Sequence, residues 1–354
     1  MRVNNSLRHL GLGTNTITDD GAVALARALS SNANSSLVLL DLNDNQIGSR
    51  GATALAELLC TRSASLTRLS LAYNDIGYVG AVALCEALAS NSVLRELDLA
   101  RCAIGEAGAR ALSTMLRSNS YLRWLDLMEN QFNAEGLTLL AEALAVNSSV
   151  QYLCLADNRF VGKCTSALSQ ALLVNSTLQE LDLRECRLGA DGIAMLCKAL
   201  SGQHANVTLQ CLQLGHNGIG ADGVSAVASM LRTNTGLRSL GLVDNRIGVD
   251  GIIPLCEALC VNTSLLCLDL ERNMLVASAA LALSAMLRVN STLQDLCLAD
   301  NWIGPAGAAS LAEALCVNKS LEELDLRECR VDATTSSALE RAVEARGVPL
   351  NFQL

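Results

Sequence analysis

The chain has 354 residues, of which 17% are charged and 51% are hydrophobic, with only two tryptophans, four tyrosines, three phenylalanines and three prolines. This composition excludes a disordered or fibrous protein, and the formal net charge of −9 argues against the basic stripe of a nucleic-acid-binding protein. The same charge disfavours binding to an anionic membrane surface. A single globular core of this size normally uses more aromatic residues. We therefore expect burial to come from Leu, Ala, Val and Cys in small similar layers, as in repeat proteins.

A repeated motif, L-x-x-L-x-L-x-x-[N/C]-x-[I/L], runs along the whole chain. Its twelve copies begin at Leu7, Leu37, Leu66, Leu94, Leu122, Val150, Leu178, Leu209, Leu237, Leu265, Leu293 and Leu321. The spacing is 28 to 31 residues and no linker interrupts it. We therefore expect one domain over residues 1–354, with an incomplete repeat at 1–6, repeats at 7–334 and a C-terminal cap at 335–354.

Each repeat changes its apolar period from two to about four, which predicts a short strand followed by a helix. Glycine stands fourteen residues after the first leucine in nine repeats, where a missing side chain would let the helix pack close to its neighbour. Cys164, Ala279 and Thr335 replace it in the other three, whose layers we expect to be spread slightly. The predicted fold is an α/β solenoid of twelve repeats.

The ninth position of the repeat is Asn in nine copies, and Cys102, Cys186 and Cys329 take its place in the others. A buried amide at this point must be hydrogen-bonded. With this repeat length, the Asn/Cys choice resembles the ribonuclease-inhibitor-type leucine-rich repeat, and Asn43 to Leu59 is similar to repeats of NOD-like receptors and Ran GTPase-activating proteins. The resemblance implies a right-handed βα horseshoe, with a parallel sheet on the concave side and helices on the convex side.

Residues typical of catalysis or metal binding do not cluster in the sequence. His9, His204 and His216 are far apart, and the fourteen cysteines lack paired metal-ligand spacing. Gly218, Gly220 and Gly223 match a dinucleotide-binding motif, but two of them belong to repeat positions. We therefore expect no enzymatic activity, no cofactor and no metal, and buried reduced cysteines.

Asn-x-Ser/Thr sequons occur eight times, nearly all where a helix is expected to end. Asparagine tolerates the left-handed conformation that closes a helix, so we interpret these residues as structural. No apolar signal segment follows Met1, which predicts a soluble cytoplasmic protein, with entry into the nucleus left open.

The concave face should carry the residues that distinguish one repeat from another. Strand side chains alternate, so positions three, five and seven of each repeat should face outward, with position eight at the rim. Acidic residues outnumber arginines there, and the few aromatic residues of the chain contribute to the same face. The candidate partner-binding residues are Tyr73, Asp98, Trp124, Asp126, Met128, Glu129, Tyr152, Asp157, Glu180, Asp182, Glu185, Asp269 and Glu271.

These features predict a non-enzymatic scaffold that binds a basic protein on its acidic concave face. The resemblance leaves two alternatives open: a GTPase-activating regulator like the Ran GTPase-activating proteins, or the ligand-sensing or autoinhibitory repeat region of a NOD-like receptor. Nucleic acid and membrane are not expected partners. An uncharged helix around Leu281, whose side chain should point outward, is a candidate surface for self-association.

Overall fold

The computed structural model describes residues 4–32, 35–61, 65–160, 164–202 and 205–354. His204 lies outside these ranges. The chain divides into two compact units, Met1–Asp182 and Leu183–Leu354, each with its own strands and helices. The assignment of a single domain stays a prediction.

The first unit alternates short strands and helices in chain order. Its strands are β1 (His9–Gly11), β2 (Leu39–Asp41), β3 (Arg68–Ser70), β4 (Glu96–Asp98), β5 (Trp124–Asp126), β6 (Tyr152–Cys154) and β7 (Glu180–Asp182). Its helices are α1 (Asp19–Ser30), α2 (Ser49–Leu59), α3 (Gly77–Ser90), α4 (Gly105–Ser118), α5 (Ala134–Leu144) and α6 (Cys164–Val174). Each strand pairs parallel with the next one along the chain.

The second unit repeats this arrangement. Its strands are β8 (Cys211–Gln213), β9 (Ser239–Gly241), β10 (Cys267–Asp269), β11 (Asp295–Cys297), β12 (Glu323–Asp325) and β13 (Asn351–Gln353). Its helices are α7 (Gly189–Ala199), α8 (Gly220–Leu231), α9 (Gly248–Leu259), α10 (Ala277–Leu287), α11 (Gly304–Leu315) and α12 (Ala333–Arg346). These strands also pair parallel in chain order.

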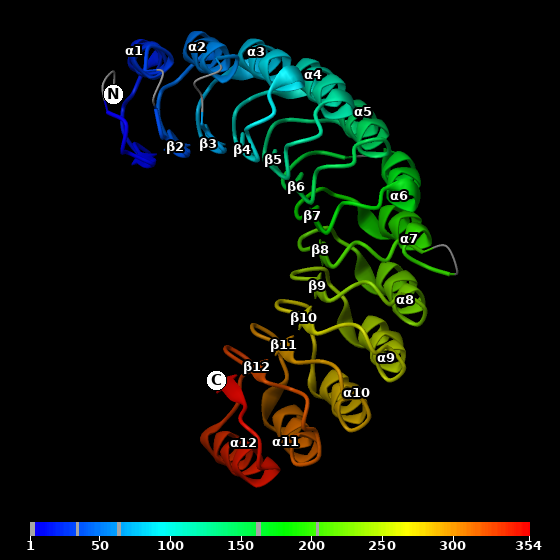
Figure 1. Cartoon of the computed structure of the whole chain (residues 1–354). Coiled ribbons are helices and arrows are strands. Elements are labelled where there is room, and N and C mark those ends of the chain that lie inside the picture. Colours follow the sequence, from blue (N-terminus) through cyan, green and yellow to red (C-terminus); the bar gives the residue numbers. More distant parts are fainter. Residues whose placement is uncertain (1–3, 33–34, 62–64, 161–163, 203–204) are drawn as a thin grey trace. The chain divides into compact units, whose positions relative to one another are not determined.

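Within each unit the strands line the inner side of a curve and the helices cover its outer side (Figure 1). We call these sides the concave and convex faces of that unit. This is the predicted βα repeat architecture. None of the helices in the described residues is both long and apolar enough to cross a membrane.

The core of each repeat is built from the leucines of the motif. In the fifth repeat Leu122, Leu125 and Leu127 are almost completely buried, and Leu140 and Leu144 of α5 are buried as well. A three-residue strand forms few hydrogen bonds by itself, so each layer depends on burial against the layers before and after it. Stability therefore comes from stacking, and side chains that face away from the leucines can vary.

A glycine early in a helix lies against the preceding helix at Gly80 and at Gly307. A Cβ atom added to Gly80 would lie 2.8 Å from Cβ of Ala52 in α2, and one added to Gly307 would lie 2.9 Å from Cβ of Ala280 in α10. Real Cβ atoms do not approach so closely, so at these two positions glycine allows the helices to stack at this distance. The predicted reason for the glycine is confirmed at these sites.

From the third repeat onward, the asparagines at the ninth position form a buried ladder within each unit. Asn158 donates from Nδ2 to the carbonyls of Leu127 and Leu155, and its Oδ1 accepts from the backbone N–H groups of Asn130 and Phe132, each within 3.0 Å. Where cysteine replaces asparagine, Sγ of Cys102 donates to the Leu71 carbonyl at 3.2 Å. The prediction of a hydrogen-bonded buried amide is confirmed.

A second asparagine ladder closes the helices, in a way that differs from the sequence-based interpretation. Asn119 has φ −77°, and its side chain donates to the Leu88 carbonyl and accepts from the Leu122 N–H. None of the described sequon asparagines has a left-handed backbone, so that expectation is wrong. These residues are Asn4, Asn147, Asn175, Asn206, Asn262, Asn290 and Asn318. The last six are 5–7% exposed, so their amides are buried inside the turns.

The predicted C-terminal cap contains α12 and one strand that the motif search missed. In β13, Phe352 stands opposite Leu324, where a repeat would have leucine. At the end of α12, Arg346 takes the position of the helix-closing asparagine. It is buried and donates from Nη2 to the Leu321 carbonyl at 2.7 Å, and burial lowers its pKa.

Candidate protein-binding site

Two large aromatic side chains meet on the concave face of the first unit. Trp124 on β5 and Tyr152 on β6 are register partners, and their rings stack with centroids 4.8 Å apart and planes 8° apart. Both side chains are half-buried. Burial is the main cause that raises the pKa of Tyr152, with Cys154 and Asp126 adding to it, so the phenol stays neutral. The stacked pair, which we call the aromatic platform, offers ring edges and the outer face of each ring to a ligand.

Acidic side chains flank this platform along the same row of the sheet. Glu96 on β4 is the register partner of Trp124, and Glu180 on β7 is the register partner of Tyr152. Glu96 also forms an ion pair of 3.2 Å with Arg68, whereas Glu180 is exposed. Glu96 was not among the selected site residues, although its position in the repeat is the same as that of Trp124.

A second row of acids runs two residues further along the strands. Asp98 is the register partner of Asp126, and Cys154 separates Asp126 from Asp182, which is only 4% exposed. Burial is the largest cause that raises the pKa of Asp98 and of Asp126. The charge of Asp41 adds to the shift of Asp98, and the charges of Asp98 and Asp182 add to that of Asp126. These carboxylates are thus crowded and incompletely neutralised.

The same aspartates also have a structural role. Oδ1 of Asp98 accepts the backbone N–H of Ala100 at 3.1 Å, and Oδ1 of Asp126 accepts that of Met128 at 2.8 Å. Asp269 in the second unit accepts the N–H of Glu271 in the same way. Each aspartate therefore closes the turn that leaves its strand. This explains why Leu-Asp-Leu recurs in the repeat without reference to a partner.

Two candidate residues, Tyr73 and Glu129, form a row with Arg101 in the turns that follow the strands. Tyr73, Arg101 and Glu129 occupy the eighth position of successive repeats, and all three have left-handed φ angles of 51° to 57°. The Arg101 guanidinium lies 5.0 Å from the centroid of the Tyr73 ring and donates to Glu129 at 2.7 Å. Tyr73 thus belongs to this row of turns, whereas Trp124 and Tyr152 lie on strands. Asp157 continues this turn row and is exposed.

Position seven of the repeat is less open than the strand alternation predicts. Met128 is half-buried, and Ala72, Ala100 and Ala156 at the same position of other repeats are buried. The strands end at position five, so the chain has already turned and a small side chain is covered there. Met128 adjoins the aspartate row through the hydrogen bond from its backbone N–H to Asp126.

The remaining candidates belong to the second unit, in which Glu185 is exposed and Asp269 and Glu271 are half-buried. Cys267, Asp269, Asp295, Cys297, Glu323 and Asp325 are among the residues that line a cavity of about 290 Å³ on the concave face. Sγ of Cys267 lies 2.9 Å from Oδ2 of Asp295. Burial, with neighbouring acids, raises the pKa of Cys267 and of Cys297 to about 12, so both thiols stay protonated.

One group in this cavity has donor atoms close enough to surround a cation. Single ligand atoms of Asp269, Glu271 and Cys297 lie within 4.8 Å of one another. However, Asp269 accepts a backbone hydrogen bond, Glu271 lies 3.6 Å from Arg272, and the Cys297 thiol is protonated. We assign no metal to this group, because these interactions account for its donors.

The two described histidines belong to different units. His9 is exposed in the first unit, and Nδ1 of His216 in the second unit lies 3.1 Å from Oδ2 of Asp244. All fourteen cysteines are free thiols. Leu281 on α10 is 60% exposed, so its predicted outward direction is confirmed.

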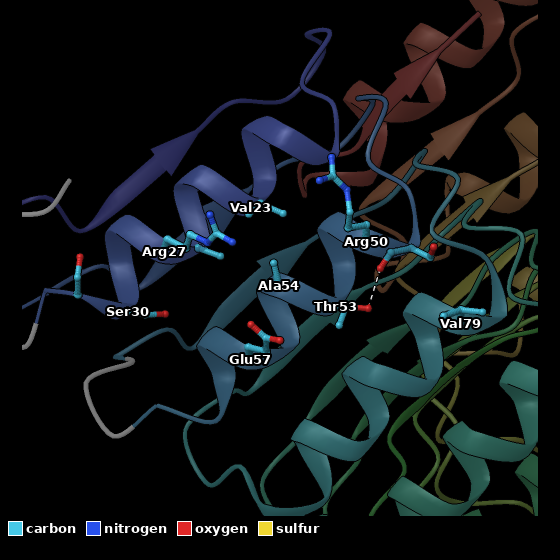
Figure 2. Close-up of a pocket in the computed structure, with 11 residues that line it drawn as sticks. Val23, Arg27, Ser30, Arg50, Thr53, Ala54, Glu57 and Val79 are labelled. Carbon is cyan, nitrogen blue, oxygen red and sulfur yellow. Dashed lines mark hydrogen bonds between the residues drawn. The ribbon is translucent and has the colours of Figure 1, made fainter.

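A larger cavity, of about 670 Å³, lies on the convex side of the first unit. Figure 2 shows side chains of α1, α2 and α3 around it, including Arg27, Arg50, Glu57 and Val79. Arg50 pairs with Asp20, and Thr53 donates to the carbonyl of Ser49. The repeat motif does not predict this cavity, because its walls come from helix positions that the motif leaves unspecified.

Comparison with protein families identifies the repeat. The model described as "Leucine Rich repeat" matches nine segments that cover more than half of the chain: 3–26, 33–56, 62–85, 90–113, 118–141, 174–197, 205–228, 233–256 and 289–312. The chain therefore belongs to the leucine-rich repeat family. The three repeats without a match are those in which Cys164, Ala279 and Thr335 replace the helix glycine.

Two solved structures are similar to the chain at low identity. Leiomodin-1 actin-binding site 2 is 22% identical with a TM-score of 0.34, and the match covers 38% of this chain and 78% of that chain. The complex of Rad7 and Elc1 in yeast is 19% identical with a TM-score of 0.47, covering 87% and 83%. No curated protein sequence matches the chain.

Proposed function

We propose that this protein is a non-enzymatic scaffold that binds a basic protein segment on the concave face of its first unit. The observation that carries the proposal is the Trp124–Tyr152 platform between carboxylates. Leucine-rich repeats commonly serve as protein-interaction scaffolds, which agrees with this function. The binding site is the set Glu96, Asp98, Trp124, Asp126, Tyr152 and Glu180, which we call the aromatic–acid site.

The electrostatics of the aromatic–acid site favour a cationic partner. Burial and neighbouring acids raise the pKa values of Asp98 and Asp126, and Arg68 offsets part of the shift of Asp98 only, so nearby positive charge compensates their ionised forms only in part. A lysine or arginine placed beside them would supply that charge and lower both pKa values. Binding should therefore be strongest above the pKa of these acids and should weaken with added salt.

The aromatic platform adds a stacking surface that can distinguish arginine from other cations. Guanidinium groups stack on the faces of Trp and Tyr rings, and Trp and Tyr dominate interface hot spots. A guanidinium stacked on the outer face of either ring would lie beside a carboxylate, because Glu96 is the register partner of Trp124 and Glu180 is that of Tyr152. We therefore expect arginine to be preferred over lysine in the bound segment.

The proposal is tested with a fluorescein-labelled octapeptide of alternating arginine and serine, titrated by fluorescence anisotropy at two salt concentrations. The variant Asp98→Asn/Asp126→Asn/Glu180→Gln should bind at least about tenfold more weakly and show a flatter salt dependence. A charge-matched control, Glu57→Gln/Glu86→Gln/Glu142→Gln, removes three acids from helices of the same unit. Equal binding by the two triple variants would refute the aromatic–acid site.

The scaffold function also differs from the GTPase-activating alternative in a measurable way. A scaffold leaves the rate of GTP hydrolysis by small GTPases unchanged, whereas a GTPase-activating protein raises it. A panel of purified small GTPases mixed with the full chain separates the two. Acceleration that survives the triple substitution in the aromatic–acid site would show a different function located elsewhere.

A further inference from the structure

The second unit carries an exposed row of side chains that the proposed function does not use. We propose that Arg246, Met274, Trp302 and Arg330, called the turn strip, bind an extended segment of a protein partner in which two carboxylates flank a large apolar side chain. The turn strip would bind an acidic segment, whereas the aromatic–acid site would bind a basic one. The turn strip lies on the turns that follow β9 to β12, and each of its residues occupies the tenth position of its repeat.

The repeat geometry fixes the spacing of the turn strip. Strands β9 to β12 pair in register, so the four residues occupy successive layers roughly 5 Å apart, and about 15 Å separates the first from the last. Trp302 is held at its backbone, because its N–H donates to the Leu275 carbonyl at 2.8 Å. Two apolar side chains, Met274 and Trp302, therefore lie between two cationic ones, Arg246 and Arg330.

The apolar centre of the turn strip is open to solvent. Met274 and Trp302 are each 48% exposed, in a chain that has only two tryptophans. The Arg330 guanidinium lies 5.7 Å from the centroid of the Trp302 ring. This contact orients the arginine over the indole and leaves its N–H groups able to donate to a carboxylate. Trp, Met and Arg are the residues enriched in protein interfaces.

The arginines of the turn strip have no ion-pair partner among the described residues. Asp244 stands two positions before Arg246 and the exposed Glu328 two positions before Arg330, and neither acid forms an ion pair with that arginine. Oδ2 of Asp244 contacts His216, and Oδ2 of Asp300 accepts from Arg272 at 2.6 Å. Asp244 and Arg246 both have left-handed φ angles, and they form no ion pair with each other. The cationic groups are therefore available to a ligand.

This arrangement favours a peptide over a nucleic acid. The row that contains Asp244, Asp300 and Glu328 runs beside the turn strip and would repel a continuous polyanion. A peptide with only two carboxylates meets less of this repulsion than a continuous polyanion does. An extended chain rises about 3.3 Å per residue, so carboxylates four residues apart reach both arginines and place the central side chain over Met274 and Trp302.

The test uses the full chain labelled with 5-fluorotryptophan, which gives one fluorine resonance each for Trp124 and Trp302. The probe is the peptide Glu-Ser-Phe-Ser-Glu with blocked ends. We expect titration to shift the Trp302 resonance and not that of Trp124, and Trp302→Phe assigns the two signals. Arg246→Glu/Arg330→Glu should weaken binding at least about tenfold, as expected when hot-spot residues are lost. The charge-matched control Arg232→Glu/Arg341→Glu changes the residue that follows α8 and one residue of α12 in the same unit, and it should bind like the wild type.

Three results would overturn the turn strip. They are an unmoved Trp302 resonance, equal affinity of the two double variants, and equal binding of Lys-Ser-Phe-Ser-Lys. If oligothymidylate shifts the Trp302 resonance and binds more tightly than the acidic peptide does, the turn strip is a nucleic-acid site instead. These results are independent of the aromatic–acid site, which is read from the Trp124 resonance with the basic peptide.

Discussion

Asp98 and Asp126 stand opposite each other on neighbouring parallel strands, and the charge of Asp98 adds to burial in raising the pKa of Asp126. Both carboxylates keep a hydrogen bond from a backbone N–H two residues later. The pair therefore combines a local structural contact with an electrostatic cost. That cost is what a cationic partner would remove.

The first prediction concerns stability and pH. The pKa of Asp126 is raised in the folded protein above its ordinary value of 3.8, so the folded protein holds this proton to higher pH than the unfolded chain does. Ionisation therefore destabilises the fold, with no effect below the unfolded pKa and the full effect above the folded pKa. Asp126→Asn should raise the melting temperature at pH 7 and keep the backbone hydrogen bond. The gain should disappear as the pH falls towards 3.

The control for this prediction is Asp157→Asn, which removes an exposed acid of the turn row in the same unit. Melting temperatures of the three proteins are compared at each pH from 3 to 8. A gain from Asp126→Asn that is the same at pH 3 and pH 7 would contradict the electrostatic explanation. Asp126→Asn should at the same time bind the arginine–serine peptide less tightly. The negative charge of Asp126 lowers the stability of the free protein but attracts the cationic peptide.

The second prediction separates dissociation from association at the aromatic–acid site. Trp124→Ala removes half of the stacked pair and should raise the dissociation rate of the arginine–serine peptide about tenfold, with a small effect on its association rate. Trp124→Phe keeps a ring on Tyr152 and should recover most of the affinity. Stopped-flow anisotropy measures both rates. Tyr121→Ala, which removes another exposed aromatic ring of the same unit, should leave both rates unchanged.

Much of the fold was predictable because the repeat constrains it. The leucines, the helix glycine and the ninth-position asparagine are each fixed by packing or by a buried hydrogen bond, and such requirements recur in every layer. Position eight was expected at the rim of the sheet, but the motif does not show that Tyr73 there adopts a left-handed backbone. Trp302 was missed because position ten was treated as unspecified. A large aromatic residue at an unspecified turn position was the available signal.

The strand face was only partly predictable for a related reason. Asp98 and Asp126 could be placed on it from alternation alone, but their contact with the following turn could not. Likewise the stack of Trp124 on Tyr152 depends on the in-register pairing of β5 with β6, which a constant 28-residue spacing suggests but does not establish. β13 was missed because Phe352 replaces the leucine that the motif requires.

The third prediction concerns the spacing of the helices. Ala in place of Gly80 would put a methyl group 2.8 Å from Cβ of Ala52 and 3.1 Å from Cβ of Ile76, so α3 must move away from α2. Gly80→Ala should destabilise the protein by about 1–3 kcal/mol, even though alanine favours helices. Gly11→Ala adds a methyl group with no atom within 4 Å and should change stability by less than about 0.5 kcal/mol. Urea unfolding followed by circular dichroism measures both, and equal effects would refute the packing role.

The fourth prediction tests the buried asparagine ladder. Asn158→Ala removes an amide that donates to Leu127 and Leu155 and accepts from Asn130 and Phe132, so several buried backbone groups lose their partners. Each unsatisfied buried group costs about 1–3 kcal/mol, so we expect a loss above about 3 kcal/mol. Asn158→Cys should be tolerated better than Asn158→Ala, because Sγ of Cys102 donates to a carbonyl at the same repeat position. Asn15→Ala, at an exposed ninth position, is the control and should cost less than either. If alanine and cysteine at position 158 destabilise equally, the hydrogen bond from sulfur contributes nothing, and Cys102, Cys186 and Cys329 are present only for their size.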